Sequence, residues 1–147
     1  MIQLKETQKT AIADLAAYLL LALLIYTAAS KFFTIDSFAS TLAKSPLIGN
    51  LNKIAAWSIP ISEVVISSLL IVTATRKLGL YAALVLLVIF TIYLSFMVLS
   101  GSKLPCHCGG VVSALSWKQH IWFNIAFISV AFIGTLMYSR NTSAPKA

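Results

Sequence analysis

Two cysteines in the C-terminal third of the chain have the residue types and the spacing for thiol chemistry. Cys106 and Cys108 are the only cysteines among 147 residues, and His107 alone separates them. Thiols this close can form a disulfide if the backbone bends between them. The ring would be small and strained, and strained, exposed disulfides exchange readily with other thiols. Pro105, before the pair, restricts the backbone that leads into it. The two glycines after the pair allow another chain to approach closely.

Three interpretations of this Cys-His-Cys-Gly-Gly segment stay open. Redox exchange is favoured by Lys103, His107 and Lys118, whose positive charge could stabilise a thiolate. A soft metal such as copper could instead bind the two thiolates, with His107 and His120 as further ligands. A passive disulfide staple is the third interpretation, although so short a loop gains little stability from a cross-link.

Glu63 is an acidic residue inside an apolar stretch. A carboxylate within a membrane span is costly, and such a residue is a functional candidate by default. Lys31, near the end of the preceding apolar stretch, could pair with Glu63 and hold two helices together. Glu63 could also carry protons beneath the thiols, and the two roles are compatible. Pro60 precedes Glu63 by three residues and could bend the helix at this depth.

His120 and Asn124 form a third candidate group. They are four positions apart, so they share one face of a helix. A histidine can act as an acid or a base near neutral pH, and one at a membrane interface can equally bond to headgroups or backbone. Trp117 lies one turn before His120 and could contact a cofactor, but tryptophans at the ends of spans are more often interfacial anchors.

These residues lie within or between four apolar stretches, at 11–33, 54–75, 78–99 and 120–139. Each has about the 20 residues that a helix needs to cross a bilayer, and lipid offers no partner to an open backbone. A short amphipathic piece is expected at about 35–42. The sequence therefore predicts an all-α, integral membrane four-helix bundle, a single domain over 1–147, with a short disordered tail at 140–147.

The composition excludes soluble and nucleic-acid-binding proteins. Hydrophobic residues make up 59% of the chain and charged residues 10%, whereas about a quarter of a soluble domain is charged. The net charge of +7 comes from residues scattered between the apolar stretches, where they would meet lipid headgroups. No basic cluster combines with stacking aromatic residues, so the expected partner is the lipid bilayer and not a nucleic acid.

The positive charges also predict the orientation. Six Lys and Arg residues fall on the side of the termini and five on the other side. The six lie in short segments close to helix ends, where the positive-inside rule has its effect. We therefore expect both termini in the cytoplasm, with the loop that carries Cys106 and Cys108 facing the periplasm, an oxidising compartment.

Motifs along the chain resemble one group of membrane proteins. Residues 30–32 (Ser-Lys-Phe) and 59–63 (Ile-Pro-Ile-Ser-Glu) are similar to signatures of DoxX-like membrane proteins. Residues 105–110 (Pro-Cys-His-Cys-Gly-Gly), with His120 and Asn124 downstream, resemble the branch of the methylamine utilisation protein MauE. The resemblance extends over nearly the whole chain.

This resemblance implies a four-helix bundle in the inner membrane of a bacterium, tied to thiol–disulfide chemistry in the periplasm. Cys106 and Cys108 would exchange electrons with an extracytoplasmic thioredoxin-like partner and support disulfide formation or the maturation of exported proteins. MauE itself is linked to maturation of the disulfide-rich small subunit of methylamine dehydrogenase. Nothing in these residues points to methylamine.

The other candidate residues have expected roles in such an exchange. His107 or His120 would assist proton transfer, and Glu63 would relay protons or hold the bundle together. Lys31, Asn124 and Trp117 would face a cofactor, for which a quinone among the helices is a candidate. A non-catalytic membrane anchor for a partner enzyme is the remaining alternative.

Overall fold

The structure is a computed structural model that describes residues 5–101 and 116–142. All regular elements in these residues are helices. Four are long and two are short: α1 (Glu6–Phe33), α2 (Ile35–Ala43), the 3-10 helix η1 (Gly49–Leu51), α3 (Asn52–Ile71), α4 (Arg76–Leu99) and α5 (Trp117–Thr142). The prediction of an all-α bundle is confirmed. Within α5, the description leaves out the side chains at 117 and 139–142.

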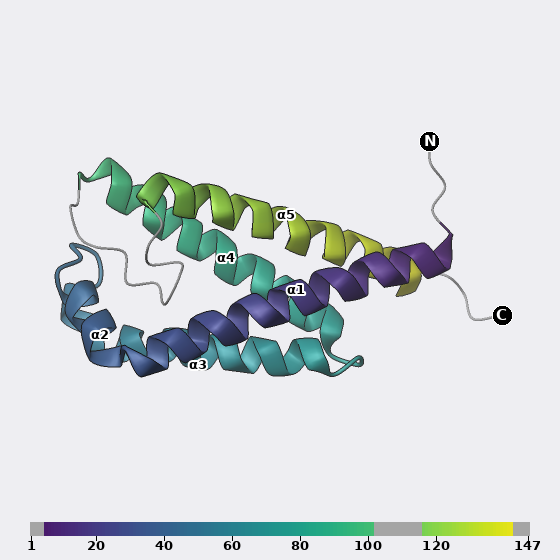
Figure 1. Ribbon diagram of the computed structural model, residues 1–147, viewed down its shortest axis with the longest axis horizontal. Coiled ribbons are helices and arrows are strands. Elements are labelled where there is room, and N and C mark those ends of the chain that lie inside the picture. The colour runs from purple at the N-terminus through teal and green to yellow at the C-terminus, as the bar shows by residue number, and fades with distance from the viewer. Residues whose placement is uncertain (1–4, 102–115, 143–147) are drawn as a thin grey trace.

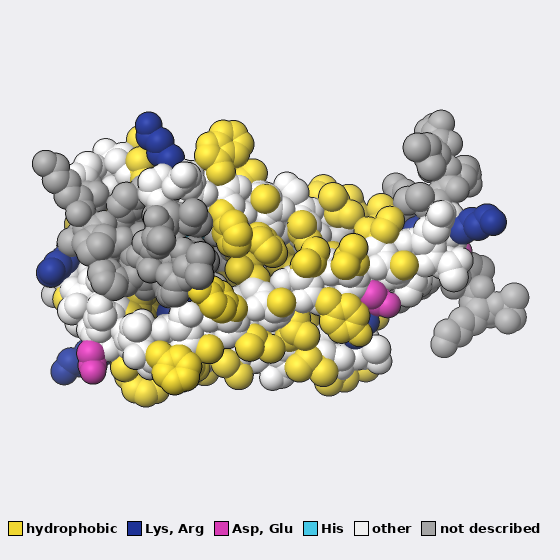
Figure 2. Space-filling view, viewed as in Figure 1, with side chains coloured by type: hydrophobic (Ala, Val, Ile, Leu, Met, Phe, Trp, Pro, Cys, Tyr) yellow, Lys and Arg dark blue, Asp and Glu magenta, His cyan; other side chains and the backbone are white. Residues whose placement is uncertain are grey.

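The four long helices have the length and composition of membrane spans. The mean hydropathy of their candidate spans lies between 1.8 and 2.7. At a rise of 1.5 Å per residue, even the 20 residues of α3 cover a hydrocarbon core about 30 Å thick. Apolar side chains cover the middle of the face seen in Figure 2, and Lys and Arg side chains gather toward its two ends. An apolar exterior of this kind suits contact with lipid.

The helix ends differ in detail from the predicted ones. α1 begins at Glu6, five residues before the apolar stretch, because the Gln8 side chain accepts a hydrogen bond from the Lys5 amide at 3.0 Å and so satisfies a backbone donor at the start of the helix. α3 ends at Ile71 and not near position 75, since Val72 adopts an extended backbone that starts the turn into α4. α5 continues to Thr142, beyond the expected end at 139. Hydropathy sets the middle of each span, and local hydrogen bonds set its ends.

The helices form an elongated bundle with two distinct ends (Figure 1). The N-terminal end of α1, the C-terminal end of α5 and the turn between α3 and α4 lie together, and we call this the terminal end. The opposite end, called the α2 end, holds α2 with the end of α4 and the start of α5. α1 packs against α3 and α5, and α4 packs against the same two helices.

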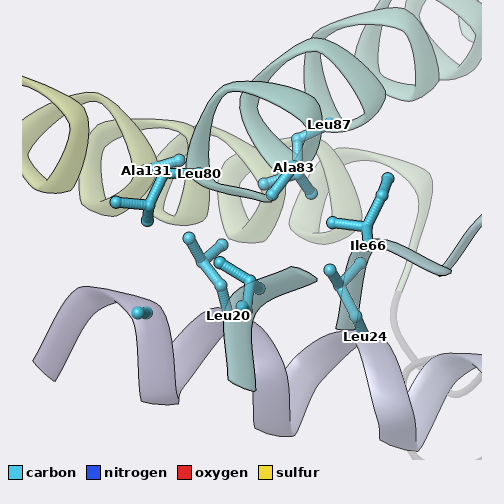
Figure 3. Close-up of a cluster of buried hydrophobic side chains, with 9 residues drawn as sticks. Leu20, Leu24, Ile66, Leu80, Ala83, Leu87 and Ala131 are labelled. Atoms are coloured by element: carbon cyan, nitrogen blue, oxygen red, sulfur yellow. The ribbon is translucent and has the colours of Figure 1, made fainter. Parts of the chain in front are cut away.

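A set of nine buried side chains from all four long helices, called the main core, joins the bundle. They are Ala17, Leu20, Leu24, Ile66, Leu70, Leu80, Ala83, Leu87 and Ala131. Figure 3 shows the leucines of α1 facing Ile66 of α3 and the side chains of α4 and α5. Small residues allow the helices to approach closely, as is usual between membrane helices. A Cβ atom added to Gly134 of α5 would lie 2.9 Å from the Cβ atom of Ala16.

The predicted amphipathic segment is the nine-residue helix α2. Its buried side chains, Phe38 and Leu42, form a second apolar cluster with Ala56 of α3. Tyr93 of α4 packs against this α2 cluster, and the side-chain amide of Asn52 donates a hydrogen bond to the Ala39 carbonyl at 3.3 Å. α2 is therefore held against the α2 end of the bundle by both apolar and polar contacts.

An ion pair crosses the terminal end of the bundle. Arg76, at the start of α4, is buried and lies 2.6 Å from the carboxylate of Asp14 in α1. Its guanidinium also donates to the carbonyls of Leu70 and Ile71, which are left open where α3 ends. The planar group spans three helices because it offers several donors in a fixed fork.

Candidate functional site

A buried ion pair between α1 and α3 is the centre of the candidate site. The Lys31 ammonium lies 2.8 Å from Oε1 of Glu63, and the two side chains are only 3% and 8% exposed. The structure thus contains the pair that the sequence suggested. Lys31 pairs with Glu63 and not with Asp36, which is exposed on α2. The free-energy cost of burying a charge at this position is lowest when an opposite charge lies beside it.

The direction of the Lys31 side chain follows from helix geometry. Side chains on a helix point back toward its N-terminus, which here means away from the nearby α2 end. Nζ of Lys31 accordingly lies 3.4 Å from the carbonyl oxygen of Thr27, one turn earlier in α1. Lysines near the ends of spans commonly extend toward the headgroups. Lys31 instead turns into the bundle, where Glu63 lies about 17 Å along α3 from its first residue.

The pair lies between the two apolar clusters. On α3, Ala56 belongs to the α2 cluster and Ile66 to the main core, and Glu63 falls between them. On α1, Leu24 is the last main-core residue before Lys31. The arrangement places one polar layer across a bundle that is otherwise apolar at this level.

A cavity of about 40 Å³ adjoins the pair and is lined by all four long helices. We call it the four-span pocket. Its lining residues are Leu23, Leu24, Thr27, Lys31, Ile59, Glu63, Leu86, Leu87, Phe90, His120, Phe123 and Asn124. α5 supplies His120 and Asn124 from one face, as their spacing predicted, and both are buried. The His120 ring lies 6.0 Å from that of Phe90 on α4.

Two polar atoms of the four-span pocket have no hydrogen-bond partner among the described residues. They are Oε2 of Glu63, an acceptor, and Nδ2 of Asn124, a donor. Buried polar atoms are nearly always paired, because an unpaired one loses its bonds to water without replacement. The two atoms are complementary in kind and belong to residues that line one cavity, so the pocket can bind a small group that both donates and accepts.

The structure brings together four of the predicted site residues and leaves four undescribed. Lys31, Glu63, His120 and Asn124 meet in the four-span pocket. Cys106, His107 and Cys108, like the Trp117 side chain, lie outside the described residues. Their predicted roles therefore stay predictions.

Two further residues of the pocket were not singled out from the sequence. Thr27 lies one turn before Lys31 and supplies a carbonyl oxygen, which its position on the Lys31 face could have indicated. Phe90 lies in the middle of the long apolar run of α4, where no sequence signal distinguishes it from a lipid-facing residue.

The pocket does not fit a quinone ring. Sites for small organic molecules usually measure about 300–1,000 Å³, and the four-span pocket is far below that range at about 40 Å³. Among residues 5–101 and 116–142, no three His, Cys, Asp or Glu side chains cluster as metal ligands would. Lys31 also neutralises Glu63, which makes the pocket a poor cation site.

The family is decided by a match over most of the chain. Residues 9–137 match the family model described as methylamine utilisation protein MauE. The chain belongs to the MauE family. The match confirms the resemblance and includes every residue of the four-span pocket. Comparison with curated proteins and with solved structures found no match.

Family and structure together identify a multi-pass membrane protein. The MauE match runs from the second turn of α1 to the last turns of α5, so it takes in all four candidate spans. The polar layer of Lys31, Glu63, His120 and Asn124 is therefore part of a membrane-spanning MauE bundle. A buried charged pair inside such a bundle is a functional candidate, as well as a structural contact.

Proposed function

We propose that this MauE-family protein is a membrane-embedded thiol–disulfide redox protein. Its Cys106–Cys108 pair exchanges electrons with a thioredoxin-like protein outside the cytoplasm and so supports disulfide formation in exported proteins. The bundle holds the cysteine-bearing loop at the bacterial inner membrane, facing the periplasm. The Lys31–Glu63 pair and His120 form the polar site at the end of the bundle where α4 ends and α5 begins.

One observation carries this proposal: the polar layer belongs to the same end of the bundle as both anchors of the loop. α4 ends at Leu99 and is followed by Ser100 and by Gly101, whose φ of +68° is the left-handed conformation in which helices commonly terminate and which glycine favours. The chain is described again from Ser116, whose carbonyl accepts a hydrogen bond from the His120 amide at 2.9 Å. His120 therefore connects the return of the loop directly to the four-span pocket.

The exchange needs no group beyond the two pairs of thiols. A thiolate of the reduced partner attacks one sulfur of the Cys106–Cys108 disulfide, and that S–S bond breaks as a mixed disulfide forms. The partner's second thiolate then attacks the mixed disulfide and closes the partner's own S–S bond. The partner loses two electrons and two protons, and Cys106 and Cys108 gain both. The reverse sequence is balanced in the same way, and the potentials of the two pairs determine its direction.

Trapping of the mixed disulfide tests this function. In Cys106→Ser or Cys108→Ser, the remaining thiolate can attack the disulfide of an oxidised partner, but the second cysteine that would release the partner from the mixed disulfide is absent. At least one variant should therefore retain a periplasmic protein through a bond that a reductant cleaves. The double variant Cys106→Ser/Cys108→Ser is the matched control and should retain none. Absence of a mixed disulfide in both single variants, with thiols that resist a mild oxidant, would contradict redox exchange.

The same variants distinguish the two alternatives. Stoichiometric copper or another soft metal in the purified protein, lost in the double variant, would identify a metal carrier. An unchanged phenotype in Cys106→Ala/Cys108→Ala, with a defect on deletion of the whole protein, would identify a non-catalytic anchor. Each result contradicts thiol–disulfide exchange as the function.

A further inference from the structure

We infer that the four-span pocket is a binding site for water, in which one or two molecules bridge the Glu63 carboxylate on α3 to the Asn124 amide on α5. The site does not depend on the cysteine chemistry. Its role is to hydrate a charged pair buried inside the membrane-spanning bundle and to link α3 to α5 through hydrogen bonds.

The polar atoms define what the site can bind. Oε1 of Glu63 is satisfied by Lys31, whereas the buried Oε2 has no donor among the described residues. Nδ2 of Asn124 likewise has no acceptor, and both residues line the pocket. Water supplies both functions from one oxygen atom. Asn124 is 4% exposed and Glu63 6%, so bulk solvent does not serve either group.

The volume selects water over larger ligands that carry a hydroxyl group. One water molecule requires about 10–15 Å³ of cavity and two to four polar partners. The four-span pocket, at about 40 Å³, has room for no more than about three or four such molecules. Lys31 and His120 also line it and provide the further polar surroundings that an ordered internal water needs.

The surroundings explain why this water would be retained. Leu24 and Leu87 of the main core line the pocket, and so does Ile59, which packs on the α2 cluster. An unpaired carboxylate oxygen and an unpaired amide in such a place would both lack hydrogen bonds. A bridging water satisfies both at a small entropic cost.

Solid-state NMR in lipid bilayers tests the site, because the chain has only two glutamates, Glu6 and Glu63. In protein labelled with ¹³C-glutamate, magnetisation transferred from water should reach the Glu63 carboxyl carbon within a few-fold of the rate for the exposed Glu6. Asn124→Leu should slow the Glu63 transfer several-fold, whereas Asn124→Ser, which keeps a polar partner, should not. Phe132→Leu, an apolar change on the exposed side of α5 and outside the pocket, is the control and should leave the rate unchanged.

Two results would overturn the inference. The first is transfer to Glu63 in the unmodified protein that is as slow as transfer to the methyl groups of Ala83 and Ala131 in the dry main core. This comparison holds even if a variant does not fold. The second is a higher melting temperature of Asn124→Leu, since removal of an unpaired buried amide stabilises a dry pocket, and removal of a bridge to Glu63 destabilises a hydrated one.

Discussion

Lys31 and Glu63 meet at 2.8 Å inside the bundle, and the lysine reaches this contact by turning away from the nearest membrane surface. The pair joins α1 to α3 at the level where the main core ends. Its energetics follow from the low polarity around it. Two opposite charges can be buried together between α1 and α3, whereas one of them alone would be a buried charge without compensation and would destabilise the fold.

The first prediction concerns single and double neutralisation of this pair. Glu63→Gln and Lys31→Met should each lower the free energy of unfolding by about 3–5 kcal/mol, because each leaves one buried charge without its partner. The double variant Lys31→Met/Glu63→Gln should recover most of that loss. Chemical or thermal unfolding in detergent micelles measures all three.

Glu6→Gln is the control for this series. This substitution removes the carboxylate of the Glu6–Lys9 pair. Because the Glu6 side chain is 57% exposed, the free energy of unfolding should change little. A double variant as unstable as the single ones would show that Lys31 and Glu63 contribute through contacts other than their mutual pairing. If the stable double variant also loses thiol–disulfide exchange, the pair acts in the chemistry as well as in the fold.

The second prediction concerns Arg76 at the terminal end. Arg76→Lys should destabilise the protein by about 1–3 kcal/mol although the charge is kept, since an ammonium cannot contact Asp14 and the carbonyls of α3 in the geometry of a guanidinium. Lys77→Ala, one residue later, breaks no ion pair among the described residues and should be close to neutral. Equal melting temperatures for Arg76→Lys and the unmodified protein would contradict this role.

These two ion pairs show what the sequence could and could not predict. Hydropathy predicts the four spans because lipid demands about 20 apolar residues from any helix that crosses it. The Lys31–Glu63 pair was also foreseeable, because a charge inside a span needs an opposite charge and few were available. The partner of Arg76 was not, since Asp14 lies 62 residues away and only the tertiary packing brings them together.

The candidate site was likewise foreseeable only in part. The spacing of His120 and Asn124 indicates a shared face, and the structure directs that face into the four-span pocket. Residue types alone do not reveal the enclosed volume, or which polar atoms stay unpaired in it. The volume of the pocket depends on how Phe90 of α4 and Phe123 of α5 pack, and at both positions the sequence shows only one more apolar residue in an apolar helix.

The third prediction tests the close approach of α5 and α1. Gly134→Ala should destabilise the bundle by about 1–3 kcal/mol, because the new methyl group would lie 2.9 Å from the Ala16 side chain and 3.2 Å from Leu80. The double variant Ala16→Gly/Gly134→Ala moves the methyl group across the interface and should restore part of the stability. Unchanged unfolding of Gly134→Ala would show that the helices separate at little cost.

The last prediction concerns sidedness, on which the proposed function depends. In a Cys106→Ser/Cys108→Ser background, Ser116→Cys should react with a membrane-impermeant maleimide in intact spheroplasts. Ala74→Cys, in the exposed turn between α3 and α4, should react only after the membrane is permeabilised. The two positions lie at opposite ends of the bundle, beside the start of α5 and at the terminal end.

The introduced cysteines at positions 116 and 74 serve as controls for each other. One of them must be accessible to the maleimide in intact spheroplasts, whichever way the bundle is inserted. Reaction of Ala74→Cys alone in intact spheroplasts would place the terminal end outside and the loop anchors in the cytoplasm. Cytosolic thiols are kept reduced, so a disulfide of Cys106 and Cys108 would not persist there. That result would contradict exchange with a periplasmic partner while leaving the fold, the Lys31–Glu63 pair and the water site of the four-span pocket unaffected.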